Sequence, residues 1–308
     1  MQNRTSKPVS LVLTALLLTA LFGCNNQTSS QAQQSSATQP KIVATFLPMY
    51  WFTKAVAGDK AQVELLIPPG TEVHDYQATP ANAQAIASAD ILVKNGIGFE
   101  EFLEATVANA KNSQLKEIDA STGIKPLDNA TPDDRAGDRA EGNPHVWLDP
   151  VLAKQQVANI RDGLIAANLE NKATYQANAT AYMQKLEALD KEFQQSLQKY
   201  PNCTFVTFHD AYPYLANRYQ IKQVAVVEIP EDQLSPTDVQ KAINAVKKYN
   251  VKALFGESGT DNKLLDALSK DLNLTLQPLD SLESGTLDPQ HYFTAMRANL
   301  QSLESACK

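Results

Sequence analysis

Residues 172–198 read KATYQANATAYMQKLEALDKEFQQSLQ, and this uninterrupted stretch decides the architecture of the chain. It contains neither glycine nor proline, and its apolar residues recur every three or four positions, which places them on one face of an α-helix. Those positions are Tyr175, Ala179, Tyr182, Leu186, Leu189, Phe193 and Leu197. About 27 residues at ~1.5 Å each give a helix of ~40 Å. The stretch therefore predicts one long rigid helix that joins two lobes.

Apolar runs with the length of strands alternate with helical patterns on both sides of this helix. The predicted strands cover residues 42–46, 63–67, 91–93, 115–118, 204–208, 223–227, 251–255 and 274–276. Helices are predicted between them, among others over 99–109. Such βαβ units form mainly parallel sheets whose two faces are covered by helices. The predicted fold class is therefore α/β, with an N-terminal lobe over 41–171, the linking helix over 172–198 and a C-terminal lobe over 199–308.

The N-terminus carries the pattern of an export signal. Arg4 and Lys7 precede a short apolar run that ends in Leu-Phe-Gly-Cys at Cys24. This pattern predicts a signal peptide over residues 1–23, because the run is too short to span a membrane comfortably. Lipidation of Cys24 is the favoured interpretation, and an ordinary cleavage site beside a coincidental cysteine is the alternative. Residues 24–40 are polar and predict a flexible tether, so we expect an extracytoplasmic protein.

Composition and cysteine usage narrow the class of protein further. The 308 residues are 43% hydrophobic, which is enough to bury a sizeable core. A net charge of −7 without a basic stripe argues against a nucleic-acid partner. Apart from Cys24, the cysteines are Cys203 and Cys307. Because disulfides persist in exported proteins, we predict that these two pair, with two free thiols as the alternative.

Three of the four histidines and one aspartate are placed along the sequence in a way that suggests a metal site. His74 lies in the loop after the second strand, and His209 and Asp280 come after strands of the C-terminal lobe. Ligand groups in open α/β sheets gather beyond the carboxyl ends of the strands. His145 lies in a segment stiffened by two prolines. Three imidazoles and one carboxylate form a ligand set that suits Zn²⁺.

Other roles for these histidines stay open at this point. His145 considered alone has an ordinary structural role as its alternative interpretation. For His291, at the start of the last predicted helix, a surface or packing role is preferred. Residues 125–144 are rich in Asp, Glu and Arg and predict an exposed charged loop that leads to His145.

Five further motifs, together with the lipobox at Cys24, carry a resemblance to a known family. They are Phe46-Leu47-Pro48-Met49-Tyr50, Gly70-Thr71-Glu72-Val73-His74-Asp75-Tyr76, Asn143-Pro144-His145-Val146-Trp147-Leu148-Asp149-Pro150, Phe208-His209-Asp210-Ala211-Tyr212 and Leu279-Asp280. In these residues the chain resembles the zinc-binding, ZnuA-type members of the metal-specific solute-binding proteins of ABC importers. The resemblance covers essentially the whole mature chain.

This resemblance implies two α/β lobes bridged by one long helix and a function outside catalysis. The expected activity is capture of Zn²⁺ as transported ligand in the cleft between the lobes, and its delivery to an ABC transporter permease by a monomeric, lipid-anchored protein. The implied metal ligands are His74, His145 and His209, with Asp280 as the fourth ligand or a close neighbour. If the linking helix is continuous, we expect local loop rearrangement on metal binding rather than hinge closure.

The third ligand separates zinc from manganese. Manganese-type relatives usually carry Glu at the position of His209, and imidazole is softer than carboxylate, so His209 favours zinc. Many zinc-binding members carry a histidine-rich loop before the proline-histidine motif, whereas residues 125–144 contain no histidine. A metal-collecting role for this loop is therefore not implied. A manganese-binding importer component remains the first alternative.

Two other function classes were weighed. A zinc-dependent hydrolase would also use histidines, but the chain lacks the His-Glu-x-x-His and Gly-x-Ser-x-Gly motifs. A surface adhesin would be a secondary role at most, because the sequence offers no separate adhesive module. The expected supports of the imidazole rings are Asp75, Asp149 and Asp210, the last with a helix cap as its alternative role. Aromatic residues beside the ligands, Tyr76, Trp147 and Tyr212, are expected to exclude water.

Overall fold

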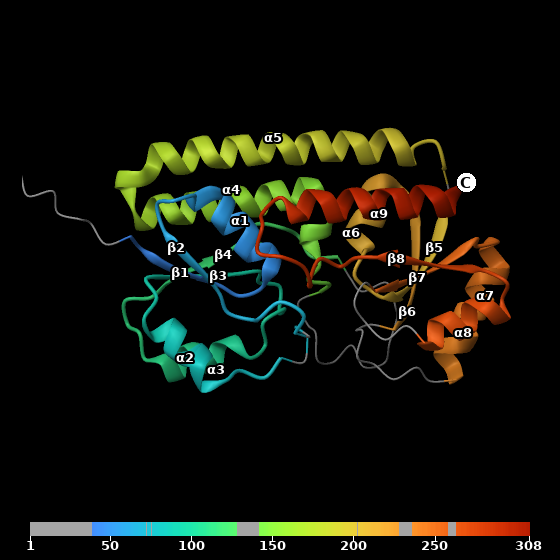
Figure 1. Ribbon diagram of the computed structural model, residues 1–308, viewed down its shortest axis with the longest axis horizontal. Helices are drawn as coiled ribbons and strands as arrows, with labels where there is room; N and C mark the ends of the chain where they lie inside the picture. Colours follow the sequence, from blue (N-terminus) through green and yellow to red (C-terminus); the bar gives the residue numbers. More distant parts are fainter. Residues whose placement is uncertain are drawn as a thin grey trace, which may run out of the picture. The chain divides into compact units, whose positions relative to one another are not determined.

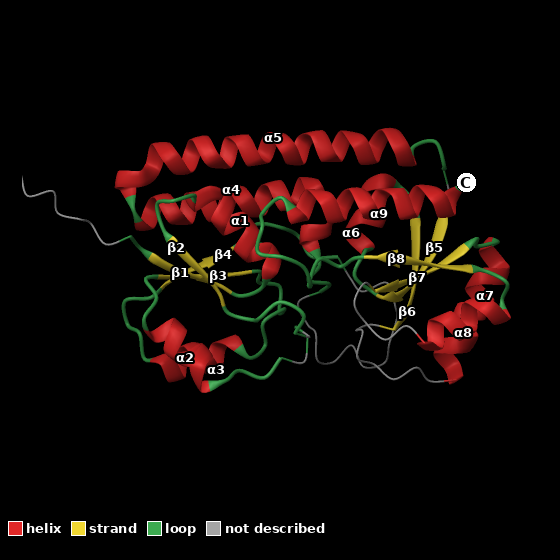
Figure 2. Ribbon diagram, in the orientation of Figure 1, coloured by secondary structure: helices red, strands yellow, loops and turns green. Residues whose placement is uncertain are grey.

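Two four-stranded parallel sheets form the centre of this computed structural model (Figures 1 and 2). The structure describes residues 39–71, 73–74, 76–127, 142–201, 203–227, 236–257 and 263–308, all within one unit, Gln39–Lys308. The first sheet contains β1 (Lys41–Ala44), β2 (Gln62–Leu65), β3 (Ile91–Lys94) and β4 (Lys116–Asp119) in the order β2-β1-β3-β4. The second contains β5 (Thr204–His209), β6 (Lys222–Val227), β7 (Ala253–Glu257) and β8 (Thr275–Leu279) in the order β6-β5-β7-β8.

Every pair of neighbouring strands in these sheets runs parallel, so each sheet has one edge at which all carboxyl ends meet. Both sheets also follow the same connection pattern, since the first strand of each lies between the second and the third. The helices that connect the strands cover the two faces of each sheet (Figure 2). The α/β fold class with two parallel sheets is therefore confirmed.

The linking helix α5 spans Lys172–Leu197, one residue shorter than predicted. All seven apolar positions of its predicted inner face are at most 4% exposed. The helix contacts α1 (Leu47–Ala57) and α4 (Pro150–Ala167) beside the first sheet, and α6 (Pro213–Tyr219) and α9 (His291–Cys307) beside the second (Figure 1). Because its backbone is continuous over 26 residues, it is a stiff connection between the two halves.

The remaining helices lie on the outer faces of the sheets. They are α2 (Pro80–Ala87), α3 (Leu103–Ala110), α7 (Pro236–Tyr249) and α8 (Lys263–Asp271). Two short 3₁₀ turns, η1 (Val146–Leu148) and η2 (Leu169–Asn171), precede α4 and α5. The largest apolar core is one cluster of contacting side chains, whose first member in the sequence is Ile42 and whose last is Ala306, and it includes the inner face of α5. Smaller clusters fill the outer face of each sheet. One core therefore supports both halves.

The start of α3 is a correction to the prediction of a helix over 99–109. Ile97 has φ 53°, and the helix begins only at Leu103. The buried carboxylate of Glu100 explains the delay, because its oxygens accept the backbone N–H groups of Asn95 at 2.7 Å and Gly96 at 3.2 Å. Bonding of these amides to a side chain holds the residues in a loop and places Phe99 inside the protein.

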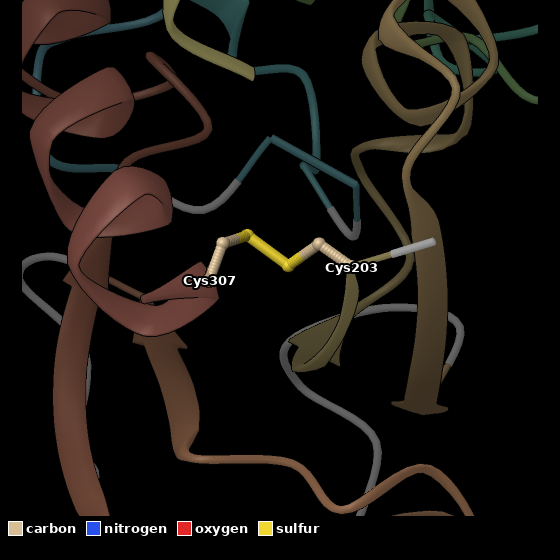
Figure 3. The surroundings of a disulfide bond; sticks show 2 residues. All are labelled: Cys203 and Cys307. Carbon is tan, nitrogen blue, oxygen red and sulfur yellow. A yellow bond between two sulfur atoms is a disulfide. The ribbon is translucent and has the colours of Figure 1, made fainter. Parts of the chain in front are cut away.

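Cys203 and Cys307 form a disulfide, as predicted (Figure 3). Their Cα atoms are 5.5 Å apart, and the bond joins the residue before β5 to the last residue of α9, across 104 positions of sequence. In the chain-entropy model a loop of about 100 residues gains up to ~4–5 kcal/mol of stability from such a bond.

Within the described residues no helix has the length and apolar character needed to cross a membrane. The predicted signal peptide, Cys24 and the tether up to residue 38 lie outside those residues. Asp75 and residues 128–141 of the predicted charged loop also lie outside them.

Candidate metal centre

His145 is fixed by the residue two positions before it. The Asn143 side-chain oxygen accepts the His145 backbone N–H at 3.1 Å and lies 2.9 Å from His145 Nδ1. The Asn143 amide nitrogen donates to the Asp210 carbonyl at 2.7 Å, which identifies its oxygen as the acceptor facing the ring. Nδ1 of His145 must therefore carry the proton, and Nε2 keeps a lone pair for a metal ion.

Burial controls the charge of this ring. His145 is 1% exposed, and desolvation lowers its pKa to about 3 despite the opposing pull of the Glu283 carboxylate. A neutral imidazole is the form that binds metal ions. The local sequence explains the burial, because Pro144 precedes His145 and the 3₁₀ turn η1 follows it, with Trp147 completely buried.

His209 ends strand β5 and is supported by a carboxylate. Its Nδ1 lies 3.2 Å from Glu257 Oε2, and Glu257 ends the neighbouring strand β7. The other oxygen, Glu257 Oε1, accepts the Ser281 backbone N–H at 2.9 Å. Burial, with a further contribution from the charge of Glu283, raises the pKa of Glu257. A carboxylate on Nδ1 directs Nε2 of His209 toward a metal, as in carboxylate–histidine–zinc triads.

His74 reaches the same point from the loop after β2. Its ring meets the ring of Phe99 edge to face, with centroids 5.3 Å apart, and its side chain is 3% exposed. Phe99 in turn packs on Trp147, with centroids 5.2 Å apart. A cavity of about 650 Å³ is lined by His74 and by Lys94 and the carboxylates of Glu101, Glu104, Glu117 and Asp119, among others.

The three imidazoles and Glu283 converge on one point. His74 Nε2 and His145 Nε2 are 3.3 Å apart, and Glu283 Oε1 lies 3.6 Å from the first and 3.4 Å from the second. One donor atom from each of these residues and from His209 lies within 4.8 Å of all the others. Ligands ~2.0–2.2 Å from a tetrahedral zinc ion would be separated by roughly 3.3–3.6 Å. The separations among His74, His145 and Glu283 therefore match those expected around a tetrahedral ion.

The electrostatics of the group favour a cation. Burial alone would raise the pKa of Glu283, but the charge of His74 and the close contacts with the His145 and His74 rings lower it well below its usual value. The Glu283 carboxylate is therefore ionised, and its side chain is only 10% exposed. An ionised carboxylate in aromatic, low-dielectric surroundings attracts a divalent ion strongly.

Of the four predicted ligands, the structure brings His74, His145 and His209 together, whereas Asp280 is outside the metal-binding group found among the described residues. The Asp280 Oδ1 accepts the Leu282 backbone N–H at 2.8 Å. Glu283, three residues further along, contributes the fourth donor atom of this group instead. It was not among the predicted ligands, because neither the strand end nor the resemblance singled it out.

The predicted ring supports also differ from those observed. Asp149 caps α4 by accepting the Val151 N–H at 2.9 Å, and its carboxylate is bound by Arg218, with Nη2 at 2.8 Å. The N-cap residue of helix α6 is Tyr212, and the Asp210 carbonyl accepts from Asn143. The supports of His145 and His209 are Asn143 and Glu257.

Of the three aromatic residues expected to exclude water, two are deeply buried and the third has another role. Trp147 and Tyr212 are buried, 0% and 1% exposed. The Tyr76 hydroxyl instead donates to Asn82 at 2.8 Å, at the start of α2. His291 packs on the ring of Trp51, with centroids 5.3 Å apart, in agreement with the packing role preferred for it.

Known proteins are similar to this chain in sequence and in architecture. The family model for "Zinc-uptake complex component A periplasmic" (ZnuA) matches residues 42–306. The zinc-binding lipoprotein AdcA of Streptococcus pneumoniae serotype 4 is 34% identical over 309 residues, which cover 97% of this chain and 60% of AdcA. This chain therefore spans less than two thirds of that relative. The high-affinity zinc uptake system protein ZnuA of Bacillus subtilis is 31% identical, with 96% of both chains covered.

A solved structure agrees with these matches. The crystal structure of the Zn(II)-bound ZnuA-like domain of S. pneumoniae AdcA superimposes with a TM-score of 0.75 at 34% identity, covering 87% of this chain and 98% of that domain. The family match over residues 42–306 and the identities above 30% over nearly the whole chain lead to one assignment. This chain belongs to the ZnuA family of periplasmic zinc-uptake components.

Proposed function

We propose that this chain is the extracytoplasmic zinc-binding component of an ABC-type importer, which captures one Zn²⁺ ion and delivers it to a membrane permease. The single observation that carries this proposal is the convergence of three imidazoles and one carboxylate, whose donor atoms all lie within 4.8 Å of one another. We assign Nε2 of His74, His145 and His209 and the carboxylate of Glu283 as the ligands. The names of the zinc-binding relatives support the choice of metal and the transport role.

The choice of zinc over manganese follows from the ligand types. Three imidazole nitrogens form a softer site than the carboxylate-rich sites that suit Mn²⁺. Four donors within 4.8 Å of one another also match the four-coordinate preference of zinc. Manganese is the alternative that the experiment must separate.

The same donor count argues for a carrier rather than a hydrolase. A catalytic zinc site keeps one position open for water or substrate, whereas four protein ligands would fill the tetrahedron proposed here. Carriage of the ion to a partner requires only binding and release.

Metal competition tests the proposal. Chelator-stripped protein is offered equimolar Zn²⁺ and Mn²⁺, and bound metal is counted by native mass spectrometry for wild type, His209→Glu and the control His291→Gln. We expect one zinc ion per chain in wild type and in the control, and a shift toward manganese in His209→Glu. Manganese in the wild type would overturn the zinc assignment, and no stoichiometric metal would overturn the site.

Capture and release are proposed to work by local movement. One apolar core supports both halves, and α5 is continuous, so a large hinge motion would have to break packing along the whole core. The irregular loop that carries His74 is the segment expected to close. Amide hydrogen exchange tests this, because zinc should slow exchange around His74, and unchanged exchange there with slower exchange along α5 would contradict it.

The attachment to the membrane is proposed to run through Cys24. The support is the basic, apolar and Leu-Phe-Gly-Cys pattern of the sequence, together with the word lipoprotein in the name of the AdcA relative. Cys24→Ser should release the protein from the membrane fraction of an expressing bacterium, while a Ser29→Ala control stays there. Release of both variants, or of neither, would contradict the anchor.

A further inference from the structure

The turn that carries Glu283 contains a non-glycine residue in a left-handed conformation. Leu282 has φ 66°, and its side chain is completely buried. A non-glycine residue in this region is strained and persists only where its surroundings hold it. Glu283 follows directly, so whatever holds Leu282 also sets the direction in which Glu283 leaves the turn.

The carboxylate of Asp280 forms the first of these restraints. Its Oδ1 accepts the Leu282 N–H at 2.8 Å, which closes an Asx turn over residues 280–282. Asp280 itself is clamped to helix α9, because its N–H donates to Asn299 Oδ1 at 2.8 Å and its carbonyl accepts from Asn299 Nδ2 at 2.7 Å. The turn is thus built by an aspartate with a fixed backbone.

The middle residue of the turn is tied to the supports of two histidines. The Ser281 N–H donates to Glu257, which also contacts His209, and the Ser281 carbonyl accepts the Trp147 indole N–H at 2.7 Å. Trp147 lies two residues after His145. The position of the turn is therefore fixed relative to His145 and His209, while Asp280 determines its shape.

We propose that Asp280 is a positioning residue of the metal centre, which folds residues 280–282 so that Glu283 reaches the three histidines, and that it does not bind the metal itself. This inference rests on the proposed zinc-binding function. It requires only a hydrogen-bond acceptor at the Asp280 side chain, whereas a ligand role requires a carboxylate. The two roles therefore predict opposite results for Asp280→Asn.

The experiment compares Asp280→Asn, Asp280→Ala and Glu283→Gln with wild type in zinc competition against a chelating dye. The amide oxygen in Asp280→Asn can still accept the Leu282 N–H, so its zinc affinity should stay within about 3-fold of wild type. Asp280→Ala removes the acceptor and should weaken binding by roughly 10- to 100-fold, as loss of a residue that orients a metal ligand does. An equal loss in Asp280→Asn and Asp280→Ala would overturn the inference, as would undiminished affinity in Asp280→Ala.

Cobalt absorption gives a readout that loss of stability alone would not move. With Co²⁺ in the site, Asp280→Asn should keep the visible spectrum of wild type, and Asp280→Ala should take on that of Glu283→Gln, because both lose the same carboxylate. A changed spectrum in Asp280→Asn would identify Asp280 as a ligand. If Asp280→Ala does not fold, as judged by thermal unfolding of the metal-free protein, the result for Asp280→Asn still distinguishes a positioning residue from a ligand. Absence of metal binding in wild type would instead refute the proposed function.

Discussion

The two halves of the molecule use the same strand order but support their histidines in different ways. In the first half, a neutral amide, Asn143, holds Nδ1 of His145. In the second half, a carboxylate, Glu257, holds Nδ1 of His209. Both arrangements hold the ring by Nδ1 and so assign metal binding to Nε2, yet only the carboxylate makes the ring more basic. Equal geometry in the two halves therefore does not imply equal strength of binding.

The halves also differ in the features that hold their structure together. The second half carries the Cys203–Cys307 bond, whereas residues 41–171 contain no cysteine. The first half buries the carboxylate of Glu100, whose loop positions Phe99 against His74. The following changes, ordered from the largest expected effect to the smallest, test these differences.

Removal of the disulfide should have the largest effect on stability. Cys203→Ser with Cys307→Ser is expected to lower the free energy of unfolding by up to ~4–5 kcal/mol, because the unfolded chain gains the freedom of a loop of about 100 residues. Urea unfolding of the metal-free protein measures this change. Zinc stoichiometry should stay at one ion per chain, and a stability unchanged within error would show that the bond adds nothing to this half.

Removal of one ligand from either half should weaken zinc binding strongly. Apparent binding free energies of about 10–16 kcal/mol shared by four ligands give about 2.5–4 kcal/mol per ligand, or roughly 60- to 700-fold in affinity. His145→Ala and His209→Ala should both fall in this range, with the larger loss for His209 because its ring has the carboxylate support. Chelator competition measures both, and the reverse ranking would contradict the comparison.

Glu100 should make the first half sensitive to pH. Burial raises the pKa of this carboxyl from 4.5 to about 7, so between these values the folded protein holds a proton that the unfolded chain has lost. The stability that Glu100 contributes is therefore present below pH ~4.5 and lost as pH rises to ~7, by about 3 kcal/mol. Unfolding of wild type and Glu100→Gln from pH 4.5 to 8 measures the difference between them, with Glu101→Gln as control. A constant difference would contradict the prediction.

Glu257→Gln should weaken the second half selectively. The two carboxylate oxygens accept from His209 and from Ser281, and a glutamine has only one oxygen to offer. If the glutamine oxygen accepts from Ser281, the amide group faces Nδ1 and forces the His209 ring into the wrong tautomer. If the oxygen accepts from His209, the turn before Glu283 loses the hydrogen bond from Ser281. We expect zinc affinity to fall by about 10- to 100-fold, with Glu187→Gln, an exposed glutamate, unchanged. Wild-type affinity in Glu257→Gln would show that this carboxylate does not support the site.

Asn143→Asp should have the smallest effect, because the substituted side chain still accepts from His145. It can no longer donate to the Asp210 carbonyl, so two acceptors would face each other across the halves. The expected loss of zinc affinity is about 10-fold, the lower end of the range for such supports. A gain in affinity would mean that the negative charge placed beside His145 outweighs the lost hydrogen bond to the Asp210 carbonyl.

The regular parts of the structure could be predicted from the sequence because their signals are repetitive. The inner face of α5 is visible as apolar residues at helical spacing, and His209 could be placed because a parallel strand delivers the residue at its end to the binding edge. Periodic patterns average over many residues, so single exceptions do not obscure them.

The parts that could not be predicted depend on single hydrogen bonds. Glu283 reaches the site through a turn in which Leu282 is left-handed, and no residue type in that turn signals this conformation. The support of His209 comes from Glu257, 48 positions away, rather than from the adjacent Asp210. Neighbours in sequence at the end of a strand point in different directions, so proximity in the sequence is a poor guide to which side chain supports a ring.

The disulfide has a practical consequence for observing this protein at work. It fixes Cys307 to Cys203, the residue before β5 (Figure 3). Strand β5 ends at His209. Six residues of strand at ~3.3 Å each span about 20 Å. A fluorescent label on Lys308 would therefore sit on a tether of known length, close enough for a paramagnetic ion bound at His209 to quench it. Arrival and departure of the metal could then be followed in real time without a substitution in the binding site.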